Sequence, residues 1–560
     1  MLVLSAFLLA LGAASTAAAL SPADTQLVKV LGAQGINLLK LSHEHARTHA
    51  RRDQIPLAVQ SAEFTPHWFR QPVDHFANGS ETWLQRYWIN TRHYKPGTHA
   101  PVIVIDGGET SGENRLPFLD TGIADILPKA TGGIGVILEH RYYGESLPVQ
   151  NFTTDSLRFL NNDQSAADSA NFMANVKFPG IDEDITSPGH PWIYYGGSYA
   201  GARAAHMKIL YPDLVYGAIA SSAVTHASLE NWEYMEIIRD AADPKCSAHV
   251  ENSIQTIDSV LMRGDGPVDR LLKDRLKGLF GLKDLEHDED FASLIESPLG
   301  YWQAKNWDPA VGSTKFDEFC EFLDRPVLPA DIAHFLAADE EAVFDMDNEI
   351  VIFEDGLEVD FSLLNYAKYI KENFVSLCPV DAGITIEECF GTYDDSAYAG
   401  TSLEDTWRLW LFQVCTEWGY FSTAPPEGYP RIVSSLLTLA YESKICKQAY
   451  KPGKYFAVPP LPNVTVVNAL GDFDIADDRL AFIDGDVDPW KPCTPHSMYA
   501  LPRDDTILRP FKLIPDGVHH YDENGLRNPA DEPPHIQKIH REIVEFVKAW
   551  LKDWTPPKKS

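Results

Sequence analysis

Cysteine, basic residues and long apolar runs are all scarce in this 560-residue sequence. The seven cysteines include no C-x-x-C pair, so the spacing typical of a zinc site is missing. Lysine and arginine total 47 against 80 aspartates and glutamates, which gives a net charge of −33. This charge argues against nucleic acid and anionic membranes as partners, because both bind concentrated basic side chains.

The one extended apolar run, residues 1–19, is rich in small residues. It predicts a signal peptide, and therefore an oxidising route on which cysteines can pair. Residues 20–60 are rich in histidine and arginine and predict either a short propeptide with a dibasic processing site or a flexible N-terminus. Sequons at Asn78, Asn151 and Asn463 are candidate glycosylation sites that agree with secretion.

The order of apolar patterns along the chain predicts an α/β protein with an insertion. Short runs typical of buried parallel strands occur at residues 102–105, 136–138, 192–195 and 218–220. From residue 226 to 409 the chain is acidic and amphipathic, which predicts helices, for example at 271–279 and 331–344.

Strand-like runs resume near residue 464. We therefore expect an α/β-hydrolase core in two parts, 61–225 and 410–555, with a helical cap domain inserted at 226–409.

One strand-to-helix junction has the composition of a nucleophile turn. Segment 196–201 reads Gly-Gly-Ser-Tyr-Ala-Gly between an apolar strand and a helical stretch. A turn this tight needs small neighbours and lifts the central serine, Ser198, clear of the sheet. The alternative is a glycine-rich turn whose serine only caps the helix.

A serine nucleophile needs a histidine to take its proton and a carboxylate to orient that histidine, in the chain order Ser, Asp, His for this fold class. Both can come from loops that follow late apolar strands. Candidates for the carboxylate are Asp484, Asp486 and Asp488, and candidates for the base are His519 and His520.

The oxyanion of such a reaction requires two backbone donors. One is the N–H of Tyr199, the residue after the nucleophile. The other is expected from the glycine turn after the strand at 102–105, where Gly108 N–H is the first choice and Glu109 N–H the second. Paired glycines at a strand end can also serve turn geometry alone.

Several segments together resemble the lysosomal Pro-X carboxypeptidase and dipeptidyl peptidase II family of serine peptidases, which includes fungal acid prolyl peptidases. The matching segments run in order from about residue 70 to the C-terminal helix. They are Gln-Pro-Val-Asp-His-Phe at 71–76, Gln-Arg-Tyr at 85–87, Glu-His-Arg-Tyr-Tyr-Gly at 139–144, Gly-Gly-Ser-Tyr at 196–199, Cys-Thr-Glu at 415–417, Asp-Pro-Trp at 488–490 and Gly-Val-His-His at 517–520.

The resemblance implies a secreted serine peptidase that cuts after proline, with Ser198 as nucleophile, Asp488 as orienting carboxylate and His519 as base. The implied reaction needs no metal or organic cofactor. Trp490 and Glu109 are the candidate substrate-binding residues. Exopeptidase action as a carboxypeptidase is the first expectation, endopeptidase action the second, and an esterase or lipase or a non-catalytic binding protein on the same scaffold are the alternatives.

The resemblance also implies peptide substrates, leaves a homodimer open, and predicts an extracellular location or the lumen of a vacuole or lysosome, with activity in acid. The implied disulfides are Cys246–Cys320, Cys415–Cys446 and Cys378–Cys389, which leaves Cys493 unpaired. The chain departs from the family pattern at Ala200, where glycine is usual, and at Ala202, where a larger apolar residue is common. The second departure affects the expected shape of the proline pocket.

Overall fold

The computed structural model describes residues 63–327 and 342–556, and the predicted signal peptide and propeptide lie outside these ranges. Its centre is an eight-stranded sheet in the order β1-β2-β4-β3-β5-β6-β12-β13. The strands are β1 His67–Pro72, β2 Thr82–Asn90, β3 Val102–Asp106, β4 Ile134–Leu138, β5 Trp192–Gly197, β6 Gly217–Ser221, β12 Leu480–Gly485 and β13 Phe511–Ile514.

From β4 to β13 every neighbouring pair of strands is parallel, and β1 and β2 are antiparallel additions at one edge. The four strands predicted at 102–105, 136–138, 192–195 and 218–220 are β3, β4, β5 and β6. This mixed sheet, with its crossover helices, is an α/β-hydrolase core, as predicted.

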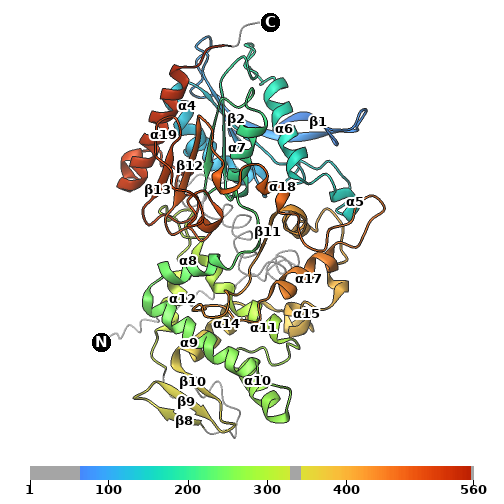
Figure 1. Cartoon of the computed structure of the whole chain (residues 1–560), viewed down its shortest axis with the longest axis vertical. Helices are drawn as coiled ribbons and strands as arrows, with labels where there is room; N and C mark the ends of the chain where they lie inside the picture. The colour runs from blue at the N-terminus through green and yellow to red at the C-terminus, as the bar shows by residue number, and fades with distance from the viewer. Residues whose placement is uncertain (1–62, 328–341, 557–560) are drawn as a thin grey trace, which may run out of the picture.

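Side chains alternate between the two faces of the sheet, as the pleat requires. Ile103 and Ile105 of β3 belong to one buried cluster, and Val102 and Val104 belong to another. Helices α3, α4 and α19 contribute to the first cluster and α6 to the second, so the sheet is covered on both faces (Figure 1). These helices are α3 Leu116–Asp120, α4 Ile123–Thr131, α6 Asn162–Asn175, α7 Tyr199–Leu210 and α19 Pro534–Lys552, with the short α5 Thr154–Leu157 and α18 Thr465–Asn468 beside the core.

The segment between β6 and β12 forms the lower half of the molecule in Figure 1 and is mostly helical. Its longer helices are α8 Glu233–Ala241, α9 Pro244–Leu261, α10 Pro267–Leu279, α11 Asp288–Ile295, α12 Lys315–Leu323, α14 Phe361–Asn373, α15 Ile386–Phe390, α16 Trp407–Gln413 and α17 Leu439–Ala449. Two short strands, β7 Ser228–Glu230 and β11 Gly419–Phe421, pair in parallel where this segment leaves the sheet and returns to it.

The helix predicted for 331–344 is wrong at its described end. Residues Ala342–Asp345 form β8, which pairs with β9 Ile350–Phe353, and β9 pairs with β10 Glu358–Asp360. The turn between β8 and β9 is closed by Asp345, whose carboxylate accepts the N–H groups of Asp347 and Asn348. A side-chain-capped turn of this kind favours a hairpin over a helix. The rest of the predicted stretch lies outside the described residues.

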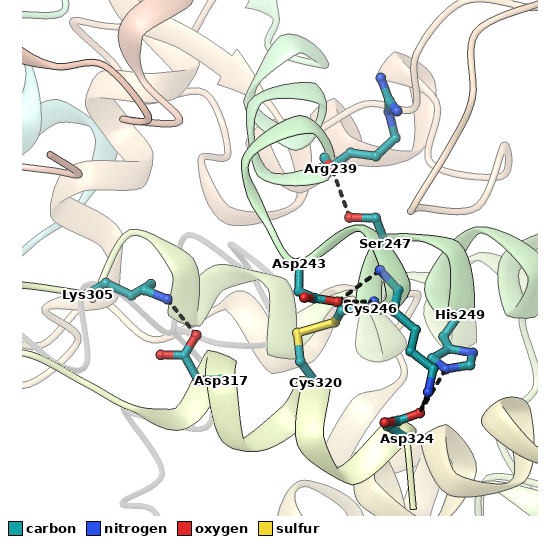
Figure 2. The surroundings of a disulfide bond; sticks show 10 residues. Arg239, Asp243, Cys246, Ser247, His249, Lys305, Asp317, Cys320 and Asp324 are labelled. Atoms are coloured by element: carbon teal, nitrogen blue, oxygen red, sulfur yellow. Dashed lines mark hydrogen bonds and ion pairs between the residues drawn. A yellow bond between two sulfur atoms is a disulfide. The ribbon is translucent and has the colours of Figure 1, made fainter. Parts of the chain in front are cut away.

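Three disulfides lie in the part of the chain between β6 and β12, with the pairs Cys246–Cys320, Cys378–Cys389 and Cys415–Cys446. Figure 2 shows the first, which joins α9 to α12. Asp243 caps α9 there by accepting the N–H of Lys245 and of Cys246. Cys493 is free and buried.

Candidate active site

Ser198 stands between β5 and α7 with φ 59° and ψ −123°, a strained conformation for a residue with a side chain. Its neighbours must be small, because a Cβ at Gly196 would lie 1.9 Å from the carbonyl oxygen of Ala200. The N–H of Ser198 donates to Ser221 O on the adjacent strand β6 at 2.9 Å. The segment therefore forms the sharp turn that the sequence predicts, with the serine at its apex.

Of the three candidate carboxylates, the structure brings Asp488 to His519. Nδ1 of His519 lies 2.8 Å from Oδ2 and 3.0 Å from Oδ1 of Asp488, which is fully buried. Asp484 instead pairs with His496 at 2.7 Å. Burial raises the pKa of Asp486. Among the described residues, Asp486 makes no hydrogen bond with His519 or with His520.

The environment of Asp488 keeps it ionised. Burial raises the pKa of its carboxyl, but the positive charge of His519 and the hydrogen bonds the carboxylate accepts outweigh burial and hold the pKa below its ordinary value. One of these bonds comes from the N–H of Trp490 at 2.9 Å. An ionised aspartate at Nδ1 fixes the tautomer in which Nε2 of His519 can accept a proton.

Nε2 of His519 is buried and has no hydrogen-bond partner among the described residues. Nε2 of the adjacent His520 is likewise buried without a partner in the described ranges, and both nitrogens are free to bind a reacting group or water. In the described ranges no hydrogen bond joins Nε2 of His519 to Ser198, and catalytic hydrogen bonds of this kind often tighten only when substrate binds.

His520, the second candidate base, forms a separate pair. Its Nδ1 lies 3.2 Å from Oε2 of the buried Glu523, and its ring stacks on that of His519 at 3.9 Å between centroids. Burial, followed by the charge of His519, lowers the pKa of His520. Nε2 of His520 would lie 3.2 Å from a Cβ built on Gly197, so the histidine pair packs directly against the serine turn.

The glycine turn after β3 lies against the first turn of α7, because a Cβ on Gly108 would lie 3.4 Å from Cβ of Ala200. The N–H of Gly108, our first choice as second oxyanion donor, donates to Oδ1 of Asp106 at 3.0 Å and is not free. No group of another described residue accepts the N–H of Glu109, the second choice. Nor does any accept the N–H of Tyr199.

Asp106 is a residue that the sequence reasoning missed. Besides Gly108 N–H it accepts hydrogen bonds from Tyr194 Oη at 2.6 Å and Arg203 Nε at 2.8 Å. Burial raises its pKa, but the charges of Arg203 and His140 together with the hydrogen bonds that the carboxylate accepts outweigh burial and lower the pKa. Because Arg203 lies on α7, its ion pair with Asp106 links the glycine turn after β3 to this helix. Its position at the end of a buried strand, one residue before the glycines, is the available sequence signal.

Residues 139–141 and their partners lie next to the serine turn. Glu139 pairs with Arg86 at 2.7 Å, and Arg141 pairs with Asp168 at 2.5 Å. His140 Nε2 lies 3.0 Å from the hydroxyl of Tyr199. All are buried, so they form a polar network beside the serine turn.

Trp490 is held by the inserted segment. Its indole N–H donates to Gln303 Oε1 at 2.7 Å, and the rings of Tyr234 and Tyr420 meet it edge-on at 5.4 and 5.1 Å. Ala202, the small residue at a position where the family often has a larger one, is fully buried on α7. The candidate glycosylation sites Asn78 and Asn463 are exposed, and Asn151 is half-buried.

A hydrolase core, a strained serine at a strand-to-helix turn and a buried aspartate–histidine pair define a serine hydrolase. A family model described as serine carboxypeptidase S28 matches residues 71–543. The chain is 40% identical over 527 residues to a probable extracellular serine carboxypeptidase of Arthroderma benhamiae, covering 91% of this chain and 70% of that protein. The chain belongs to the serine carboxypeptidase S28 family and is a serine carboxypeptidase.

More distant relatives include the mouse thymus-specific serine protease, 26% identical over 87% of either chain. Among solved structures, proline iminopeptidase of Mycobacterium smegmatis covers 86% of this chain and 98% of its own at 12% identity and a TM-score of 0.35. No described helix is long and apolar enough to cross a membrane.

Proposed function

We propose that the protein removes the C-terminal residue of peptides by cutting after proline, through an acyl-enzyme on Ser198. The observation that carries the Ser198 mechanism is the Nε2 atom of His519, which has no partner among the described residues and belongs to the one of the two adjacent histidines that is paired with an aspartate. Its other ring nitrogen is held by the buried Asp488, so Nε2 is left to accept the serine proton.

In this mechanism Ser198 Oγ attacks the peptide carbonyl as its proton passes to His519 Nε2. The oxyanion is held by the N–H groups of Tyr199 and Glu109, the second of which replaces the occupied N–H of Gly108. His519 then returns the proton to the leaving nitrogen, and water repeats the sequence to release the acyl group.

The preference for proline rests on Trp490 and on the family resemblance. Trp490 is two residues from the orienting Asp488, and a flat indole suits packing against a pyrrolidine ring. The small Ala202 leaves the shape of this pocket to the inserted segment, whose Tyr234 and Gln303 hold the indole.

We further propose that the protein acts outside the cell or in an acidic lumen, with 61–225 and 410–555 as core and 226–409 as cap. The relative from Arthroderma benhamiae is named extracellular, and three disulfides fit an oxidising compartment. Exposed Asn78 and Asn463 are proposed to carry glycans. A homodimer is compatible with this proposal, because both partners of the aspartate–histidine pair and the serine come from one chain.

The test compares N-blocked substrates that differ only in proline or alanine before the scissile bond, with an ester beside them. We expect Ser198-dependent cleavage of the proline peptide at least ten times faster than of the alanine peptide. A fluorophosphonate probe should label wild type and not Ser198→Ala. Equal cleavage after alanine would reject the proline pocket, and labelling that persists in the alanine variant would reject Ser198 as nucleophile.

A further inference from the structure

Arg115 is a buried arginine whose charge is not neutralised. It ends the short helix η1 Gly112–Arg115 and is 5% exposed. Its Nε donates to Gly107 O at 3.2 Å. Within the described ranges its two terminal nitrogens make no hydrogen bond and no ion pair, although buried arginines are normally paired.

The terminal nitrogens of this guanidinium lie beside the glycine turn after β3. Nη2 is 3.5 Å from a Cβ built on Gly108, and Gly108 in turn lies against Ala200, two residues past the nucleophile. Glu109 Oε2 and His519 Nε2 are fully enclosed and have no partner among the described residues. The two Nη atoms of Arg115 also lack a partner there, but they are not fully enclosed. The guanidinium is therefore open to an incoming group.

The nearest carboxyls leave this charge available. Glu523 is engaged by His520 at 3.2 Å. Glu109 interacts electrostatically with Arg115 and with His519 but has no ion pair with either within 4.0 Å, and its Oε2 has no partner. Arg115 thus has two planar, unoccupied donors of the geometry that binds a carboxylate in a bidentate manner.

The position relative to His519 indicates which part of a substrate these groups meet. The base histidine delivers a proton to the leaving nitrogen. Glu109 interacts electrostatically with His519, and Arg115 interacts with the adjacent His520, so both groups lie towards the leaving-group side of the scissile bond. In a carboxypeptidase the leaving group is one amino acid with a free α-carboxylate. On the other side of the bond, the contacts of Trp490 are aromatic rings and an amide, which suit an uncharged residue.

We propose that Arg115 and Glu109 bind the α-carboxylate of the C-terminal residue of the substrate. The proposal rests on the proposed function and deepens it. Arg115 supplies the paired donors, and Glu109 in its neutral form donates one further hydrogen bond from its carboxyl group. Recognition of this carboxylate makes the protein an exopeptidase.

Ionisation of Glu109 would oppose binding by placing a second negative charge at the same position. Burial raises the pKa of Glu109, against the lowering effects of Arg115, its own N–H and His519, while Asp106 raises it further. Tyr143 also faces it, with a pKa far above neutrality that keeps the phenol uncharged. Affinity for the free carboxylate should therefore fall as pH rises and Glu109 loses its proton.

The experiment uses two blocked dipeptide substrates, acyl-Pro-Phe with a free C-terminal acid and the same peptide as its amide. Wild type should prefer the acid by about 10- to 100-fold in kcat/KM, the range of a charged hydrogen-bonded contact. Arg115→Met should bring this ratio close to one. Arg115→Lys should restore part of it, since lysine keeps the charge and loses the paired geometry. Arg509→Met, at an exposed arginine paired with Asp478, is the matched control and should keep the full ratio.

Glu109→Gln supplies a second readout. KM for the acid substrate should rise with pH in wild type and should be nearly independent of pH in this variant, because an amide cannot ionise.

Retention of the acid preference in Arg115→Met would overturn the proposal, as would a wild-type ratio near one. If Arg115→Met does not fold, inhibition of wild type decides: acetylphenylalanine must inhibit at least ten times more tightly than its amide, or the proposal falls. Failure of the proposed function gives a different result, since neither peptide would then be cut in a Ser198-dependent manner.

Discussion

The sheet region, which comprises the eight strands and the helices that cover them, and the inserted segment between β6 and β12 are held together by different means. The sheet region contains buried arginine–carboxylate pairs close to the serine turn, Arg203–Asp106 foremost. The inserted segment contains the three described disulfides and the aromatic rings around Trp490. The candidate catalytic residues thus lie among fixed ion pairs, and the segment that contacts Trp490 is cross-linked by disulfides.

The difference has a physical reason. A buried ion pair adds little net stability, but it allows only one arrangement of its partners, which suits groups that must keep fixed distances. A disulfide limits how far a segment can unfold without fixing side chains around it. Five predictions test this contrast, from the largest expected effect to the smallest.

The largest effect is expected at Asp488. Asp488→Asn should lower kcat about 10⁴-fold with little change in stability, because an amide favours the wrong tautomer of His519. Asp484→Asn is the matched control, since Asp484 is also buried, near the end of β12, and pairs with a histidine, His496. Steady-state rates of both variants settle the matter, and comparable losses in the two would contradict the assignment of Asp488.

Breaking the ion pair between Asp106 and Arg203 should destabilise the sheet region. Asp106→Asn leaves Arg203 buried without its counter-charge, so the free energy of unfolding should drop by about 3–5 kcal/mol. Urea denaturation followed by fluorescence measures this. The double variant with Arg203→Met should recover part of the loss, and a single variant as stable as wild type would show that the pair is dispensable.

Removing the disulfide between α9 and α12 should act on the inserted segment. Cys246→Ala with Cys320→Ala should cost about 3 kcal/mol, and hydrogen exchange should rise between these helices while the sheet strands stay protected. The matched control is Cys378→Ala with Cys389→Ala, whose loop of 11 residues against 74 predicts a loss smaller by about 1.7 kcal/mol. Exchange that rises equally in the sheet would contradict the separation of the two regions.

Stability should fall as pH rises from acid towards neutrality, because of Asp522. Burial raises its pKa to about 6, against hydrogen bonds from Ser221 and Tyr195. A carboxyl with a raised pKa in the folded state contributes stability below its unfolded value, and loses it as pH rises through the folded one. Between pH 4 and 7 wild type should lose on the order of 2 kcal/mol more than Asp522→Asn in urea denaturation. Parallel pH profiles would contradict this.

The smallest effect is expected where the two regions meet. Gln303→Met removes the acceptor of the Trp490 indole N–H, and one such hydrogen bond is worth about 1 kcal/mol. The ratio of proline to alanine cleavage should therefore fall about 3- to 10-fold, with kcat on the proline substrate nearly kept. A loss of kcat without a change in the ratio would separate Trp490 from the pocket.

The sequence predicted the elements whose signals are local. Buried parallel strands are continuous apolar runs, so β3 to β6 were recognisable, and the serine turn is marked by small residues that its geometry requires. The choice among Asp484, Asp486 and Asp488 came from the family resemblance alone, since all three lie at the end of the same apolar run.

Other features depend on where side chains point across the fold. That Gly108 N–H is occupied follows from the orientation of Asp106, and the open guanidinium of Arg115 follows from the absence of a carboxylate within reach. Neither leaves a pattern in the sequence. The hairpin at β8 and β9 was missed because a short amphipathic stretch fits a helix and a strand about equally well.

The pairing of β7 with β11 places the departure and the return of the chain next to each other. A Cβ on Gly419 would lie 2.1 Å from Ser228 O, so only glycine allows the two strands to meet this closely. This strand pair brings the two ends of the stretch between residues 231 and 418 together. Because the two ends meet in one strand pair, a change of length inside this stretch need not alter the distance between the points where the chain leaves the sheet and where it comes back towards it.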